Sequence, residues 1–357
     1  MDLLPCLRST RRCRSAETLR GPQGRSNGSR LNGGWLSTVA DETVLSSKVP
    51  PGRSGVTLLQ YLSGRFKYQS VEQWREHILQ GHVSVNGRRT QPETKLAKWD
   101  EVAFRTELHE PPVDPRIRIL HEEDAFLVAF KPGQLPSHSD THFIRNTFIH
   151  LLSAKLREQG FAGRAALAHR LDRETSGLLV VAKNKDAQRA LTRQFEAGEV
   201  DKEYLAVGRG VAGQDVYEVE GLIERDPESR ISIRRRLVPG DPASATRFEV
   251  LERLKDCTFL KCLPRTGKTH QIRVHLAHLG FPVAGDKLYG RTDQEHLEYL
   301  HFVKTGGDPS WDGRLEAPRQ LLHASRLCFK HPVTGEPLVF EEPVPEDIQS
   351  FLQAHRV

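Results

Sequence analysis

A proline-rich stretch in the first half of the chain constrains the fold more than any other feature. The segment Glu107–Arg116 reads ELHEPPVDPR, with three prolines and no hydrophobic period. Proline has no amide hydrogen to donate, so helices and sheet ladders stop in such a segment. The chain of 357 residues is also longer than a single core usually accommodates. We therefore expect two domains, over residues 57–106 and 118–357, joined by a linker over residues 107–117.

The first 56 residues have the composition of a disordered tail. They are rich in Arg, Ser and Gly and show no sustained hydrophobic period. Nine Lys and Arg against four Asp and Glu give them a net charge of +5, whereas residues 57–357 carry 43 basic and 42 acidic residues. Binding of a nucleic acid by the folded part would therefore require a local basic patch. We expect a solvated tail in a cytoplasmic protein, with a transit peptide for a mitochondrion or chloroplast as the alternative.

Composition excludes several other classes of protein. Hydrophobic residues make up 37% of the chain, which is enough for a buried interior. The longest apolar runs, such as Ala125–Phe130, are far shorter than the roughly 20 residues of a membrane-crossing helix. The five cysteines form neither a disulfide framework nor paired zinc-ligand spacing. We expect a soluble protein of a reducing compartment that does not enter a membrane.

Residues 57–106 show the pattern of two helices followed by a hairpin. The strings TLLQYLSGRF and VEQWREHILQGH space apolar residues three and four apart, and VSVNG alternates before a turn at Asn86-Gly87. This segment resembles the S4 RNA-binding module, whose closing G-x-V-x-V-N-G motif stands at Gly81–Gly87. The resemblance implies that Arg88 and Arg89, directly after the turn, contact RNA. An ordinary amphipathic helix pair with a solvated hairpin is the alternative.

Beyond residue 117, short apolar strands alternate with helical patterns. Strand patterns stand at residues 119–130, 176–184, 202–208 and 257–263, and helical patterns at 146–160, 186–198 and 270–280. This mixture predicts an α+β domain over residues 118–357.

The most informative string is AHRLDRETSGLLVVAKN, which runs from Ala168 to Asn184. Asp172 lies in a polar turn that ends at Thr175–Gly177, immediately before a buried strand pattern. We therefore expect Asp172 at the mouth of a strand. Capping of the turn by the Asp172 side chain is the alternative role.

Three further strings favour a catalytic role for Asp172. KEYLA stands at Lys202–Ala206, RTGKTHQIRVHLAHLG at Arg265–Gly280 and GDKLYG at Gly285–Gly290. Together with HRLDRETSG they resemble the RluA family of RNA pseudouridine synthases, over residues 118–345. KPGQLPSHS near the start and LLHASRLCFKHPVTGEPL near the end belong to the same resemblance. It implies a mixed, largely antiparallel sheet of the pseudouridine synthase type, preceded by a small α/β S4-like domain.

The resemblance also implies a reaction that needs no external cofactor. Uridine in RNA becomes pseudouridine: the C–N glycosidic bond breaks, the base turns and a C–C bond forms. The catalytic residues of the family fall on Asp172, Tyr204 and Arg273. Asp172 would either attack C6 of the base or promote release of uracil from C1′, while Arg273 holds its carboxylate with two hydrogen bonds. Tyr204 would stack on the uracil; a structural ion pair and a core tyrosine are the alternatives.

A uridine inside a stem has to leave the helix, at roughly a few kcal/mol per unstacked base. Arg170 is expected to fill the space that the base leaves, with a phosphate contact as the alternative. Lys268, His270 and Gln271 are further expected RNA contacts. Lys268 replaces the arginine of the family's G-R-T-H-Q-I-R, which keeps the charge and loses the forked geometry. The expected partner is ribosomal or transfer RNA, and the expected state is a monomer.

Two other kinds of site and one other function compete with this interpretation. A phosphate loop needs a glycine five residues before Gly267, where Cys262 stands. His270, His275 and His278 have neither HExxH spacing nor a cysteine cluster beside them, so we expect no metal. The alternative function is an RNA-binding protein of the same fold that no longer catalyses.

Overall fold

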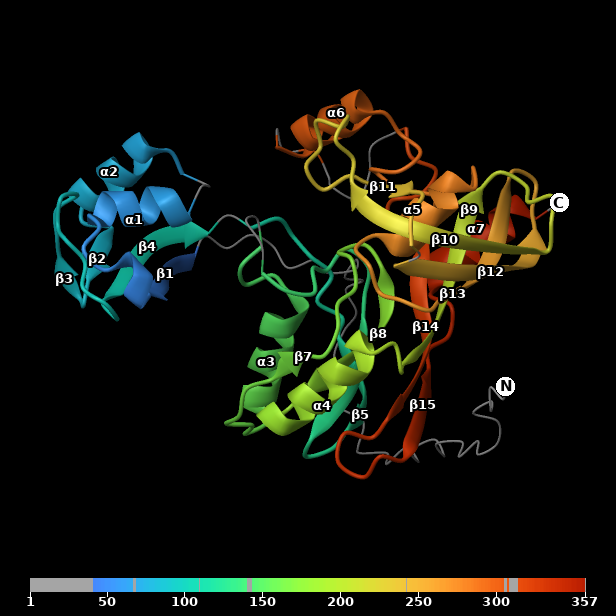
Figure 1. Ribbon diagram of the computed structural model, residues 1–357, viewed down its shortest axis with the longest axis horizontal. Coiled ribbons are helices and arrows are strands. Elements are labelled where there is room, and N and C mark those ends of the chain that lie inside the picture. Colours follow the sequence, from blue (N-terminus) through green and yellow to red (C-terminus); the bar gives the residue numbers. More distant parts are fainter. Residues whose placement is uncertain are drawn as a thin grey trace, which may run out of the picture. The chain divides into compact units, whose positions relative to one another are not determined.

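The computed structural model describes residues 41–66, 69–108, 110–139, 143–241, 243–304, 307 and 314–356. Within them the chain forms two separate β-sheets, each with helices and a hydrophobic core of its own. Residues 41–108 are called the N-terminal module and residues 110–356 the main domain, and each is described by itself (Figure 1). The basic tail with its possible transit peptide is predicted over residues 1–56, and residues 1–40 of it lie outside the described residues.

The N-terminal module combines a four-stranded antiparallel sheet with two helices. Its elements are β1 (Asp41–Lys48), a 3-10 turn (Pro51–Arg53), α1 (Leu58–Arg65), α2 (Val71–Leu79), β2 (Val83–Val85), β3 (Arg88–Arg89) and β4 (Glu101–Leu108), in the sheet order β1-β4-β2-β3. A capping box begins each helix, headed by Thr57 and Ser70. Asn86 and Gly87 both have positive φ, as a two-residue hairpin requires. The helix pair, the strand and the hairpin turn predicted from the sequence are confirmed.

The folded part begins earlier than the sequence predicts. The predicted tail covers residues 1–56, but residues 41–48 form β1, which pairs with β4 along its whole length. Leu45 packs against the core of the module, and Val49 is fully buried. A short strand whose partner is distant in sequence has no helical period, and the polar residues around it conceal it from compositional analysis.

The main domain is built on an eleven-stranded sheet in the described part of the chain. Its strands are β5 (Arg118–Glu122), β6 (Phe126–Lys131), β7 (Ala166–Leu167), β8 (Ser176–Ala182), β9 (Asp201–Arg209), β10 (Val216–Arg225), β11 (Arg235–Val238), β12 (Ser244–Arg253), β13 (Cys257–Pro264), β14 (Leu322–Lys330) and β15 (Pro337–Glu341). They follow the order β11-β10-β12-β13-β9-β14-β8-β6-β5, with β15 beside β14 and β7 beside β8. Of these pairings only that of β14 with β8 is parallel. The predicted α+β class with a mixed, largely antiparallel sheet is confirmed.

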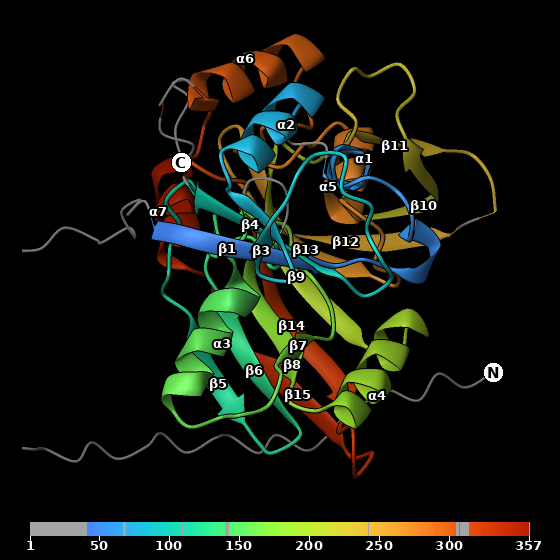
Figure 2. The ribbon, with the colours of Figure 1, turned by 90° about the vertical axis from the view of Figure 1, so that its left-hand side faces the viewer.

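Helices cover both faces of this sheet. They are α3 (Phe148–Glu158), α4 (Lys185–Glu196), α5 (Gln271–His278), α6 (Asp293–Lys304) and α7 (Glu346–His355). Figure 2 shows α3 and α4 on either side of the strands β6 and β8. Side chains alternate between the faces, so Leu127 and Leu179 join the core under α3, whereas Val128 and Leu178 join the core under α4. Every residue of β8 is consequently buried.

The proline-rich segment is only partly a linker. β4 continues to Leu108, and Val113 is fully buried in the core under α3. The Glu110 carboxylate accepts hydrogen bonds from the amides of Arg145 and Asn146, at 2.8 and 2.7 Å. This segment therefore packs along the main domain, because a carboxylate and an apolar side chain find partners there that composition does not reveal.

Gly177 allows the parallel pair of strands to approach closely. It lies in β8 opposite Ala324 of β14, with a φ of 123°. A Cβ at this position would lie 2.3 Å from the carbonyl oxygen of Ala324 and 2.6 Å from its nitrogen. We expect Gly177→Ala to lower the free energy of unfolding by about 3 kcal/mol or more, because the clash is with backbone and the φ is strained. Urea unfolding measures this loss.

Gly213→Ala is the matched control for this substitution. No atom lies within 4 Å of the Cβ that it would add. We expect its free energy of unfolding to change by less than about 1 kcal/mol. Equal free energies of unfolding for the two variants would show that the close approach of β8 and β14 at Gly177 does not limit the side chain at this position.

Candidate active site

The loop that carries Asp172 is held by an earlier part of the chain. The Ser137 hydroxyl donates to the Leu171 carbonyl at 2.6 Å and accepts from the Leu171 amide at 3.1 Å. The buried Lys131 ammonium donates to three backbone carbonyls, among them that of Arg173 at 3.0 Å. The string KPGQLPSHS thus holds the Asp172 loop directly before β8, and the predicted place at the mouth of a strand is confirmed.

Arg273, in the first turn of α5, links two carboxylates. Its Nη1 donates to Oδ2 of Asp172 at 2.8 Å. Its Nε and Nη2 donate to Oδ2 and Oδ1 of Asp286, at 2.7 and 2.9 Å. The forked grip that the sequence predicts on Asp172 is therefore wrong, because the fork holds Asp286 and Arg273 donates a single hydrogen bond to Asp172. A planar guanidinium has donors on more than one edge, so one side chain can join both carboxylates.

Asp286 belongs to the site and is missed by the sequence analysis. Its side chain is 0% exposed, and its Oδ1 also accepts from the amides of Leu288 and Tyr289. Four hydrogen bonds thus satisfy a buried carboxylate. The string GDKLYG could have identified Asp286 as a site residue, because an acidic residue beside buried apolar residues requires a buried counter-charge.

Burial and counter-charge act on the Asp172 carboxyl in opposite directions. Burial alone would raise its pKa, but the charge and the hydrogen bond of Arg273 lower the pKa below its ordinary value. The same two causes leave the pKa of Asp286 lowered. Burial disfavours the charged Arg273, yet its two carboxylate partners raise the pKa of the guanidinium. The Asp172 side chain is 30% exposed, so an ionised carboxylate is accessible to a substrate.

Tyr204 lines the same pocket as Asp172. It lies in β9, between Cys262 of β13 and Ala324 of β14. Burial, together with the negative charge of Asp172, raises the pKa of the phenol. Its hydroxyl therefore stays protonated at neutral pH, which favours packing of the ring against a substrate over removal of a proton by a phenolate.

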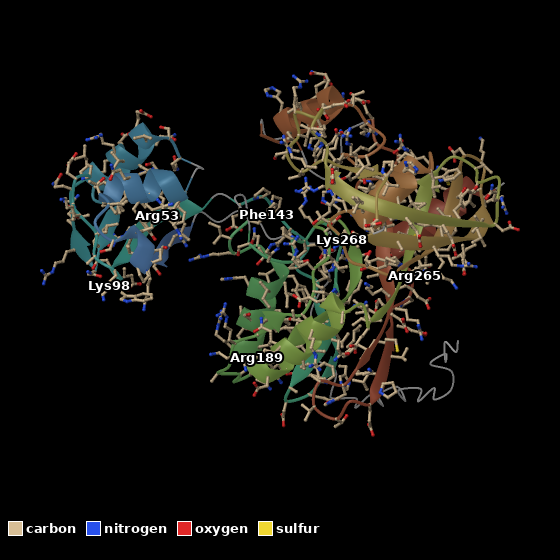
Figure 3. All side chains as sticks on the ribbon, in the orientation of Figure 1. Arg53, Lys98, Phe143, Arg189, Arg265 and Lys268 are labelled. Carbon is tan, nitrogen blue, oxygen red and sulfur yellow. The ribbon has the colours of Figure 1, made fainter. Side chains whose placement is uncertain are left out.

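One cavity joins these side chains with four of the predicted RNA contacts, Arg170, Lys268, His270 and Gln271. It has a volume of about 100 Å³ and is lined by Asp172, Tyr204 and Arg273 and by the exposed residues Arg170 and Lys268. Figure 3 shows Lys268 in the middle of the main domain, below β11 and above α4. The structure thus brings seven side chains predicted from the sequence around one pocket.

Gln271 also lines the pocket, but its polar atoms are already engaged. It is 4% exposed, its Oε1 accepts from the Thr266 hydroxyl and the Lys268 amide, and its Nε2 donates to two groups of β12. The hydrogen-bonding capacity of the amide is used within the protein. The geometry therefore gives Gln271 a structural role in the loop before α5, in place of the predicted RNA contact.

His270 precedes α5 in a left-handed conformation, with φ 60° and ψ 17°. A non-glycine residue in this region carries roughly 1 to 3 kcal/mol of strain, and such residues cluster at functional sites. The ring Nδ1 lies 2.9 Å from the Tyr289 hydroxyl. Burial and the neighbouring Arg273 charge lower the pKa of His270 to about 4, so the ring at the pocket is neutral at pH 7.

Arg88 and Arg89 lie in β3 of the N-terminal module, and both are exposed. Nη2 of Arg89 donates to the Gln80 carbonyl at 2.6 Å. Their side chains are not among those that line the pocket.

The histidines of α5 are not arranged as metal ligands. His275 is fully buried, and its two ring nitrogens lie 3.0 and 3.1 Å from the hydroxyls of Thr246 and Ser244. Among the residues that the structure describes, no group of three or more His, Cys, Asp or Glu could hold a metal ion. None of the described helices has the length and hydropathy of a membrane span.

Buried and half-buried histidines make the stability of the main domain depend on pH. Burial lowers the pKa of His270, His275 and His323 to about 4 and that of His169 to about 3. In the unfolded chain these rings take up protons as the pH falls through about 6.5, whereas in the folded chain they stay neutral until about pH 4. The contribution of these neutral rings to the stability of the folded chain is therefore complete above about pH 7. It is lost progressively from about pH 6.5 to 4.

We expect the free energy of unfolding to fall by a few kcal/mol between about pH 7.5 and pH 5. Urea unfolding at a series of pH values in this range is the measurement. A stability that stays constant or rises as the pH falls would contradict the neutral, buried state of these rings.

Comparisons with known proteins find related chains. A family model described as RNA pseudouridylate synthase matches residues 125–278. The chain is 34% identical over 326 residues to ribosomal large subunit pseudouridine synthase D of Xanthomonas campestris pv. campestris, across 90% of this chain and 95% of the relative. It is also 34% identical to an uncharacterized RNA pseudouridine synthase of Bacillus subtilis, across 79% of this chain and 88% of the relative. Among solved structures, human RNA pseudouridylate synthase domain containing 1 aligns with a TM-score of 0.50 and 26% identity, across 69% of this chain and 96% of that one.

Proposed function

Because the chain belongs to the RNA pseudouridylate synthase family and is an RNA pseudouridine synthase, we propose that it acts on large-subunit ribosomal RNA and that Asp172 carries the reaction. The observation that supports Asp172 is its ionised, partly exposed carboxylate at a pocket. Arg273 holds this carboxylate, and Tyr204 lines the same pocket.

The proposed class of RNA comes from the names of the relatives. Several that are 32 to 34% identical are named ribosomal large subunit pseudouridine synthase D, and the chain spans nearly all of their length. We extend this class of substrate to the present chain.

The test uses unmodified transcripts of large-subunit ribosomal RNA, small-subunit ribosomal RNA and transfer RNA, each containing 5-tritiated uridine. Tritium leaves C5 when C5 becomes bonded to C1′, so its release reports pseudouridine formation. We expect release from the large-subunit transcript alone. Release from transfer RNA alone would contradict the proposed substrate and leave the enzymatic activity standing.

The proposed reaction starts from a uridine that has rotated out of its helix into the pocket. The bond between C1′ and N1 breaks, the uracil turns, C1′ bonds to C5, the proton on C5 leaves to solvent, and N1 takes up a proton from solvent. Reactant and product are isomers, so the chemistry needs no cofactor. Attack of Asp172 on C6 and release of uracil from C1′ both require an ionised carboxylate, which the Arg273 charge maintains.

Two side chains at the rim are proposed to hold the RNA around this uridine. Arg170 lies in the same loop as Asp172, two residues before it, and its Nη1 lies 3.1 Å from Nε2 of His138. Its planar guanidinium can stack in the space that the base leaves. Lys268 is exposed and has no carboxylate partner in the described part of the chain, which suits a point contact with a phosphate.

The N-terminal module is proposed to be an S4-like RNA-binding domain. Arg88 and Arg89 are exposed beside its two-residue turn, and neither has a carboxylate partner among the described residues. We expect the full-length double variant Arg88→Gln/Arg89→Gln to reduce the slope of log affinity against log salt concentration by roughly 1 to 2. Filter binding to the large-subunit transcript measures the slope.

Arg75→Gln is the control for the N-terminal module. Arg75 is an exposed arginine of α2 that pairs with Glu93 at 3.2 Å, so its charge is already partly compensated. The Arg75→Gln variant should bind RNA with the wild-type slope of log affinity against log salt concentration. An unchanged slope in the double variant would remove Arg88 and Arg89 from the RNA interface.

A further inference from the structure

The hairpin of β10 and β11 carries an excess of positive charge. From Arg225 to Arg236 the chain reads RDPESRISIRRR, with five arginines and two acidic residues. Arg234 pairs with a carboxylate of α6 at 2.9 Å, and Arg236 pairs with Glu228 at 3.4 Å. Arg235 uses its Nη1 for two carbonyls of its own loop. Within the described ranges, neither Arg225 nor Arg235 has a carboxylate partner.

This hairpin is attached to the wall of the active-site pocket. Ile231, in its loop, is buried in a cluster with Val274 of α5 and with Tyr289. The Arg235 amide donates to the Tyr289 hydroxyl at 3.2 Å, and this hydroxyl lies 2.9 Å from the ring of His270, which lines the pocket. Two successive hydrogen bonds, through the Tyr289 hydroxyl, therefore connect the hairpin to His270 at the pocket.

The two arginines without a carboxylate partner face each other across the hairpin. Arg225 and Arg235 are directly opposite in the antiparallel register of β10 and β11. They lie on the same face of the ribbon as Ile223 and Leu237, which pack against the cluster that includes α5. Like charges in directly opposite positions destabilise an antiparallel pair. An anion bound between them would replace this repulsion with two attractive contacts.

We propose that Arg225 and Arg235 together bind a phosphate of the substrate RNA close to the uridine in the pocket. This inference rests on the proposed function, since it adds a second contact surface to the same RNA. Arginine suits the role because its forked donors match the oxygens of a phosphate. The hairpin and Lys268 then both contact the RNA backbone, while Arg170 occupies the space that the base leaves.

The experiment compares two double variants with one control. Arg225→Gln/Arg235→Gln removes both charges, and Arg225→Lys/Arg235→Lys keeps them. Arg189→Gln is the control, because Arg189 is an exposed arginine of α4 that pairs only with the exposed Asp186 in the described structure. Helix α4 lies in the lower half of the main domain and strand β11 in the upper half in both views, with Arg189 labelled in Figure 3.

Each full-length protein is titrated with the unmodified large-subunit transcript at several salt concentrations. For Arg225→Gln/Arg235→Gln we expect the slope of log affinity against log salt to fall by roughly 1 to 2. Affinity at about 0.15 M salt should fall roughly 10- to 100-fold, as expected when hydrogen bonds to charged groups are lost. The lysine double variant should keep the slope, and Arg189→Gln should match the wild type.

The two proposals fail in different measurements. If the wild type releases tritium from the transcript but the glutamine double variant keeps its affinity and slope, the hairpin contact is overturned and the proposed function stands. If both double variants lose the slope alike, the substitutions have altered the fold of the hairpin, and the charge-based contact is again overturned. If the wild type releases tritium from no RNA, the proposed function fails whatever the binding slopes are.

Discussion

Asp172→Asn is expected to abolish pseudouridine formation in a protein that still folds and binds RNA. A neutral amide can act neither as nucleophile nor as base, so tritium release should fall by at least about 10³-fold. The substitution removes one charged partner of Arg273, whose charge stays paired with Asp286 through two hydrogen bonds. We therefore expect the free energy of unfolding to change by less than about 2 kcal/mol.

Asp186→Asn is the control for the loss of a carboxylate. Asp186 is an almost fully exposed residue of α4, and it does not line the pocket. The Asp186→Asn variant should release tritium at the wild-type rate. Turnover that survives in Asp172→Asn would assign the chemistry to another residue. Equal background from the wild type and Asp172→Asn would favour a protein that binds RNA without catalysing.

Asp286→Asn is expected to lower the rate of turnover roughly 10- to 100-fold, with RNA affinity nearly unchanged. The amide group of Asn would set N–H donors against the N–H donors of Arg273, so the fork is lost. Arg273 is then no longer fixed in the position from which it holds Asp172. Asp286 is fully buried, so it does not reach RNA itself. Single-turnover rates and filter binding separate the two effects.

Asp347→Asn is the matched control for Asp286→Asn. Asp347 also accepts two hydrogen bonds from one buried arginine, Arg319, at 2.5 and 2.9 Å, but it does not line the pocket. Both variants should lose stability, and only Asp286→Asn should lose most of its turnover. Equal losses of turnover in the two variants would reduce Asp286 to a structural residue.

Local patterns in the sequence predicted a large part of the fold. The apolar spacing of α1, α2, α3, α4 and α5 and the turn at Asn86-Gly87 were sufficient, because each depends on backbone geometry within a few residues. Strand β1 escaped this reasoning, since its pairing with β4 joins residues 41–48 to residues 101–108. Burial of Val113 in the proline-rich segment escaped it for the same reason, because its neighbours come from other parts of the main domain.

The chemical groups of the active site follow from the sequence, and so does the prediction that Asp172, Tyr204 and Arg273 gather in one place. The hydrogen bonds between these side chains, in contrast, follow from the tertiary structure. Asp172 and Arg273 are 101 residues apart, and the fork of Arg273 is occupied by Asp286.

Two other contacts could not be predicted from the sequence for the same reason. The Gln271 side-chain amide donates hydrogen bonds to β12, and Arg225 lies opposite Arg235 in the sheet. A hydrophobic period needs only the geometry of the local backbone. A hydrogen bond, in contrast, depends on distances of tenths of an ångström and on angles between groups from distant segments, and only the packing of those segments sets them.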